Sequence, residues 1–147
     1  MTSMSITHQL RHHWEQKHVE CGEQILSENI KDFEVMNKVV LPLDFREYLI
    51  ELNGMIGNNS DDDGMRFYPL KEIRRCDYND QKYLVLNKNF YIFADFSVDL
   101  FNYAIELLPT SSATNSVCLI GAEAPILIAQ SFTDFLKIYL AGEAANY

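Results

Sequence analysis

Hydrophobic positions recur every three to four residues in several segments, and residues 41–54 show the clearest pattern. Their apolar side chains fall at i, i+3, i+4 and i+7, which places them on one face of a helix; they are Phe45, Tyr48, Leu49 and Leu52. Pro42 suits the first turn of a helix, and Asn53-Gly54 tolerates the left-handed turn that closes one. We therefore predict an amphipathic helix that packs against a core.

Two further helices are predicted before this segment, at residues 5–20 and 27–38. Each has a serine near its start that can cap a helix, and Gly22 can end the first. Their apolar stripes are Ile6, Leu10 and Trp14 in the first, and Ile30, Phe33 and Met36 in the second.

Aromatic and β-branched residues then dominate a run of predicted strands. We expect a short strand at residues 65–68 and one helical turn within 70–76. A hairpin of strands 90–94 and 100–107 follows, with its turn at 95–99, and then strands 117–120 and 125–129. Because these strands follow one another without intervening helices, the sheet is predicted to be largely antiparallel.

The last predicted helix begins after Ser131, which can cap it, with Asp134 at the reciprocal capping position. Gly142 can end the helix, and residues 143–147 are predicted to form a frayed tail. The pattern as a whole predicts a single α+β domain over residues 1–147, with a mostly antiparallel central sheet packed against N-terminal helices and a C-terminal helix. Ten residues are predicted to form its core: Phe45, Tyr48, Leu49, Leu52, Phe93, Tyr103, Ile105, Phe132, Phe135 and Leu136.

Composition fits one folded domain, with 147 residues, 48% hydrophobic and 22% charged. No apolar run approaches the roughly 20 residues that cross a bilayer, and the N-terminus lacks the apolar core of a signal peptide, so we expect a cytoplasmic protein without a membrane partner. Cys21, Cys76 and Cys118 are odd in number and in no C-x-x-C pairing. They are interpreted as reduced thiols rather than as disulfides or zinc ligands.

The formal net charge is −9, and residues 89–147 contain six acidic residues against Lys137 alone. The only local basic cluster is Lys71, Arg74 and Arg75, which is short, so direct nucleic-acid binding is disfavoured. Net negative charge aids solubility in any case, but it also favours association with a basic protein.

Two segments carry side chains of the types that bind metal ions. His8 and His12 have the i, i+4 spacing that could chelate a metal from one helix face, but the sequence places no third ligand, and solvated helix histidines explain the pattern better. If the loop beginning at Asn59 is aligned with a calcium-binding EF-hand, Leu70 falls where a bidentate glutamate is needed. We therefore predict no metal.

Catalytic signatures are also missing from the sequence. It has no G-x-S-x-G nucleophile turn, no P-loop and no G-x-G-x-x-G. A carboxylate pair such as Asp95 with Asp99 needs burial and a suitable separation to do acid–base work, and turn aspartates explain both residues more simply. No enzymatic activity and no cofactor are expected.

Five blocks in one order resemble the SUKH superfamily over residues 25–141. They are Ile30-x-x-Phe33-Glu34, Leu41-Pro42-x-x-Phe45-x-x-Tyr48-Leu49-x-x-Leu52-Asn53-Gly54, Phe90-x-x-Phe93-Ala94, Tyr103-x-Ile105, and Ala129-x-Ser131-Phe132-x-x-Phe135-Leu136-x-x-Tyr139-Leu140. Members commonly carry a glycine-containing turn where this chain has Phe96-Ser97-Val98, so the sequence departs from the family pattern there.

The superfamily includes fungal regulators of cell-wall glucan synthesis and bacterial immunity proteins that neutralise toxins, often nucleases. The resemblance implies a non-catalytic binding protein: an immunity protein that occludes a cognate toxin with a basic surface, or alternatively a regulatory interaction domain in cell-wall synthesis. Because loops can vary without disturbing the core, the candidate partner-binding residues are acidic loop positions. They are Asp61, Asp62, Asp63, Asp95 and Asp99.

Overall fold

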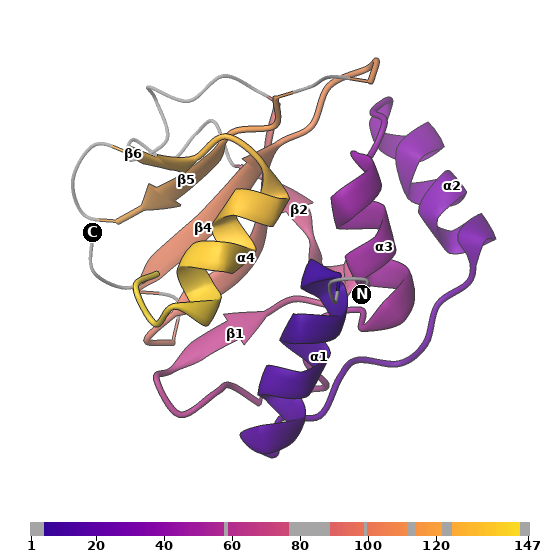
Figure 1. The fold of residues 1–147 in the computed structure, drawn as a ribbon. Coiled ribbons are helices and arrows are strands. Elements are labelled where there is room, and N and C mark those ends of the chain that lie inside the picture. Colours follow the sequence, from indigo (N-terminus) through magenta and orange to yellow (C-terminus); the bar gives the residue numbers. More distant parts are fainter. Residues whose placement is uncertain are drawn as a thin grey trace.

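The computed structural model describes residues 5–57, 59–76, 89–98, 100–111, 114–121 and 125–144. Over these ranges the chain forms four α-helices, a short 3-10 helix (η1) and six strands (Figure 1). In chain order they are α1 (Ile6–Gln16), α2 (Ser27–Asn37), α3 (Leu43–Glu51), β1 (Met65–Phe67), η1 (Leu70–Glu72), β2 (Arg74–Arg75), β3 (Phe90–Phe96), β4 (Phe101–Glu106), β5 (Val117–Ile120), β6 (Ile126–Ala129) and α4 (Phe132–Leu140).

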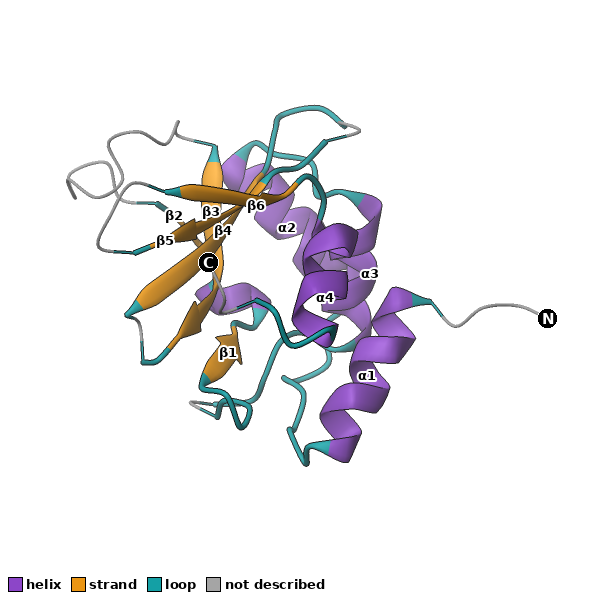
Figure 2. Ribbon diagram, turned by 60° about the vertical axis from the view of Figure 1, so that its left-hand side comes forward, coloured by secondary structure: helices purple, strands orange, loops and turns teal. Residues whose placement is uncertain are grey.

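The strands form one antiparallel sheet in the order β1-β3-β4-β5-β6, with β2 also pairing with β3. β1 and β2 therefore lie along the same side of β3, one after the other, and η1 connects them. Figure 2 shows the helices gathered on one side of the sheet. The predicted α+β domain with a largely antiparallel sheet is confirmed.

The helix predicted within residues 41–54 is confirmed as α3, with Pro42 as its N-cap. Asn53 and Gly54 then adopt the left-handed conformation, with φ of 51° and 69°, so the predicted helix ending is also confirmed. All ten predicted core residues are at most 1% exposed.

The C-terminal helix α4 begins and ends as predicted. The Ser131 hydroxyl accepts a hydrogen bond from the Asp134 amide at 3.0 Å, and Gly142 has φ of 76°. The rings of Phe132 and Phe135 lie 5.6 and 5.3 Å from that of Phe93 in β3, in edge-to-face geometry. These aromatic contacts join α4 to the centre of the sheet.

Several predicted details are wrong. Met36 of α2 is 82% exposed, although its spacing placed it on the apolar stripe. The helical turn predicted within residues 70–76 is confirmed as η1, but the strand β2 that follows it was not predicted. Ala144, assigned to the frayed tail, is buried, and its carbonyl accepts a hydrogen bond from the Tyr103 hydroxyl at 2.9 Å; residues 145–147 lie outside the described part.

The turn after β3 is the place where the sequence departs from the family pattern. Ser97 and Val98 adopt φ of 57° and 53°, the left-handed conformation that glycine takes without steric cost. Ser97 and Val98 therefore adopt this conformation at a steric cost. The cost is larger for Val98 because its side chain is β-branched.

Candidate functional site

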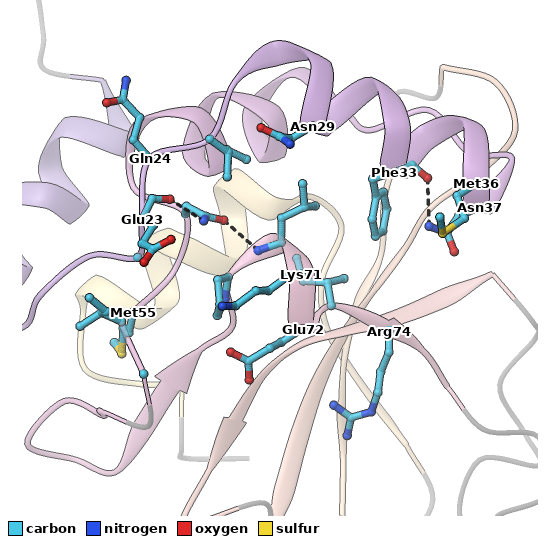
Figure 3. A pocket seen from close by; sticks show the side chains of 18 of the residues that line it. Glu23, Gln24, Asn29, Phe33, Met36, Asn37, Met55, Lys71, Glu72 and Arg74 are labelled. Atoms are coloured by element: carbon cyan, nitrogen blue, oxygen red, sulfur yellow. Dashed lines mark hydrogen bonds between the residues drawn. The ribbon is translucent and has the colours of Figure 1, made fainter.

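A groove with a volume of about 880 Å³ lies between α2 and the η1–β2 segment. One wall is residues 22–25 and the face of α2 that carries Asn29, Phe33 and Met36. The other wall is residues 69–75, with residues 53–57 closing one end (Figure 3). Two of the family-like blocks contribute to this groove, through Phe33 and Asn53.

Asn53 holds the two walls of this groove together. Its side-chain amide donates a hydrogen bond to the Glu23 carbonyl at 2.7 Å, and its side-chain oxygen accepts one from the Leu70 amide at 2.8 Å. Asn53 is buried, so losing either bond would leave a buried polar group unpaired. The asparagine that ends α3 thus also fixes the spacing of the groove walls.

Arg66 of β1 fixes the end of the groove near Gly57. Its guanidinium donates to the Gly57 carbonyl at 2.6 and 3.0 Å, and to both carboxylate oxygens of Glu72 at 2.8 and 3.0 Å. Both contacts to Glu72 come from one guanidinium nitrogen, Nη2, and hydrogen bonds between two charged groups are among the stronger ones. The negative charge of Glu72 is therefore already matched within the protein.

The groove combines an apolar lining with basic side chains. Phe33 packs edge-on against Tyr91 of β3, with ring centroids 6.1 Å apart, and Leu70 and Ile73 are each 7% exposed. Lys71, Arg74 and Arg75 are exposed on the same wall. A groove of this composition can bind a ligand that has both apolar and negatively charged groups.

Arg74 also lies next to a buried hydrogen-bonded pair, Tyr68 and Asp95. Its guanidinium lies 5.7 Å from the centre of the Tyr68 ring, and the Tyr68 hydroxyl donates to Asp95 at 2.7 Å. Burial, reinforced by this carboxylate, raises the pKa of Tyr68 well above its ordinary value. Asp95 lies within β3 and is 8% exposed, so its predicted position in an exposed turn is wrong.

Asp61 is likewise buried, at 9% exposure. Its carboxylate accepts hydrogen bonds from the Asp63 and Met65 amides, each at 2.9 Å, and from the Tyr139 hydroxyl at 2.6 Å. That hydroxyl in turn accepts one from the Trp14 indole at 3.0 Å. Asp61 therefore organises its loop from inside, and the prediction that its side chain is presented on the surface is wrong.

The other predicted partner-binding aspartates differ from these two. Asp62 is exposed and forms an ion pair with Lys17 at 3.3 Å, and Asp63 is exposed. Asp99 lies outside the described residues. A binding role for any of the five stays a prediction, and Asp62 and Asp63 have the exposure that it requires.

Potential metal ligands are scattered over the described ranges. No group of three or more histidine, cysteine, aspartate or glutamate side chains placed to hold an ion is found there. His8 and His12 are exposed on α1, whereas His13 is half-buried with its ring 5.6 Å from that of Tyr139.

The cysteine thiols are poorly suited to nucleophilic chemistry. Burial raises the pKa of Cys76 to about 12 and that of Cys118 to about 11, so both are protonated at neutral pH. Cys21, Cys76 and Cys118 are all free thiols. In addition, none of the helices described has the length and hydrophobicity needed to cross a bilayer.

Together these features define a helix-covered antiparallel α+β domain with a groove and an acidic loop on its described surface. The chain belongs to the SMI1 / KNR4 family (SUKH-1), whose sequence model matches residues 24–138. The comparison with curated proteins and the comparison with solved structures each gave no match. Membership of this family is consistent with an immunity or a regulatory role and with a protein partner.

The groove was not among the sites predicted from the sequence. Lys71, Arg74 and Arg75 were interpreted only as a basic cluster too short to favour nucleic-acid binding, and Met36 was predicted to lie on the apolar stripe of its helix. An exposed methionine beside a basic cluster becomes visible as a surface only when α2 and β2 are brought together in space. Asn53, in the family-like block at residues 41–54, was the one available signal.

Proposed function

We propose that this protein is a non-catalytic immunity protein that binds a cognate toxin directly and occludes its active surface. The observation that carries the proposal is membership of the SMI1 / KNR4 family over residues 24–138. The net charge of −9 supports a partner with a basic surface, as expected of a toxin that acts on nucleic acid. Asp62 and Asp63 are proposed to meet that surface.

The buried aspartate supports this choice of loop. Because Asp61 bonds two amides of the loop and the Tyr139 hydroxyl of α4, the exposed side chains of Asp62 and Asp63 project from a fixed backbone. A fixed loop loses less conformational entropy on binding than a free one. Rigid presentation of charge is what an occluding protein needs.

The proposal is tested with the product of a toxin gene adjacent to the gene for this chain. Equimolar protein should bind the toxin and abolish its activity, and higher ionic strength should slow association more than it speeds dissociation. Replacing both Asp62 and Asp63 with Asn should reduce this salt dependence. The matched control replaces the exposed Glu47 and Asp134 with Gln and Asn, which removes the same charge elsewhere.

Equal rates and salt slopes for the loop variant and wild type would remove this loop from the interface. Failure to bind any adjacent toxin would favour the second reading, a regulatory interaction domain in cell-wall synthesis. Altered cell-wall glucan content after deletion of the gene would then be the expected phenotype.

A further inference from the structure

The short strand β2 has one paired edge and one edge that faces away from the sheet. The Cys76 amide donates to the Phe90 carbonyl at 3.0 Å, and Arg74 is opposite Ile92. In an antiparallel ladder, hydrogen-bonded pairs alternate with non-bonded pairs, so Arg75, opposite Tyr91, is a non-bonded position. Its backbone N–H and C=O therefore point away from β3.

The edge that carries these backbone groups borders the groove. Ile73, Arg74 and Arg75 are all lining residues, and Phe33 and Met36 of α2 form the facing wall. Met36 is 82% exposed, so its apolar side chain is accessible to a ligand in the groove. A strand edge facing apolar side chains is the arrangement by which many domains bind extended peptides.

The charges on this edge distinguish it from the rest of the molecule. In a protein of net charge −9, Lys71 and Arg75 line this wall, whereas the side chain of Arg74 points away from α2 (Figure 3) and its guanidinium lies 5.7 Å from the centre of the Tyr68 ring. Within the described ranges neither Lys71 nor Arg75 forms an ion pair, and Glu72 is occupied by Arg66. The wall therefore offers positive charge to a ligand.

We propose that the groove between α2 and β2 binds an extended peptide segment of a partner protein that adds a strand to the outer edge of β2. Main-chain hydrogen bonds form with Arg75, apolar side chains of the peptide contact Phe33 and Met36, and its carboxylates lie against Lys71 and Arg75. This inference goes beyond the proposed immunity function. That function places an acidic loop of this chain against a basic toxin surface, whereas here a basic groove of this chain binds an acidic segment of a partner. The outward backbone groups and apolar wall favour a peptide over a nucleic acid.

The test uses a displayed library of random twelve-residue peptides selected on the full chain, and needs no toxin. The enriched sequences should alternate apolar residues with Asp or Glu, because alternate side chains of a strand share one face. Arg75→Gln keeps the backbone N–H but removes the charge, whereas Arg75→Pro removes both without touching the bonds to β3. Arg75→Pro should bind the enriched peptide roughly five- to tenfold more weakly than Arg75→Gln, since it loses one further hydrogen bond.

Charge reversal provides the matched control. Lys71→Glu should weaken binding, whereas Lys137→Glu, an equal change at an exposed site on α4, should leave it unaltered. If Arg75→Pro fails to fold, amide exchange of Arg75 in the wild type replaces it, and the enriched peptide should slow that exchange. Selection of no sequence, equal binding by Arg75→Gln and Arg75→Pro, or unchanged Arg75 exchange would each overturn the proposal.

Discussion

The helices α4 and α2 have similar hydrophobic spacing but differ in how much of it they bury. In α4 the whole stripe, Phe132, Phe135, Leu136 and Tyr139, is at most 6% exposed. In α2 only Ile30 is buried, whereas Val35 and Met36 are 72% and 82% exposed. The spacing of hydrophobic residues predicts that a helix forms. The neighbouring elements determine how much of its apolar face is buried.

The neighbours of the two helices explain this difference. α4 contacts α1, α3 and β6 and lies over the sheet. α2 instead is held by Phe33 against Tyr91 and by Glu34, whose carboxylate accepts from the Leu41 amide at 2.7 Å and from Arg46 at 2.9 Å. Its exposed Met36 borders the groove, so the less buried helix is the one available to a partner.

The largest expected effect is on α4. Phe135→Ala should lower the free energy of unfolding by about 3–5 kcal/mol, because a fully buried aromatic ring leaves a cavity. Phe33→Ala in α2, where the ring is half-buried, should cost clearly less. Chemical denaturation of both variants measures the difference, and equal losses would show that α2 contributes as much to the core as α4.

A smaller effect is expected from the buried hydrogen bonds of α4. Tyr139→Phe keeps the ring but leaves the Trp14 indole without its acceptor and the Asp61 carboxylate without one of its three donors. We expect a loss of about 1–3 kcal/mol in the free energy of unfolding, measured by denaturation. Tyr91→Phe, in the sheet next to α2, is the matched removal of a tyrosine hydroxyl, and a larger loss from it would contradict the comparison.

The same contrast separates what the sequence could predict from what it could not. Caps such as Ser131 and the α3 ending at Asn53-Gly54 act within a few residues, so local pattern was sufficient to predict them. The burial of Asp61 depends on Tyr139, 78 positions away, and that of Asp95 on Tyr68, 27 positions away. Nothing in the spacing of loop aspartates indicates such partners, which is why both were predicted to be exposed.

The start of α2 is a second case in which the local sequence pattern did not predict the structure correctly. Ser27 was predicted to cap the helix, but Leu26 is the N-cap, and its amide donates to the Asn29 side chain at 2.8 Å.

The groove could not be predicted from the sequence for a further reason, because it depends on the distance between α2 and β2. Asn53 joins the segments that precede these two elements, through its bonds to the Glu23 carbonyl and the Leu70 amide.

The smallest expected change in stability is at Met36. Because its side chain is 82% exposed, Met36→Ser should alter the free energy of unfolding by no more than about 0.5 kcal/mol, the range usual for surface positions. The same variant should weaken binding of an extended apolar-acidic peptide, since it removes apolar area from the wall that faces β2. Denaturation and peptide titration of one protein sample measure both quantities.

A matched Val35→Ser variant, whose exposed residue is not among the groove lining, should leave both the stability and the peptide affinity unchanged. A large loss of stability in Met36→Ser would mean that the α2 stripe packs like that of α4, and unchanged peptide binding would mean that Met36 plays no part in the groove.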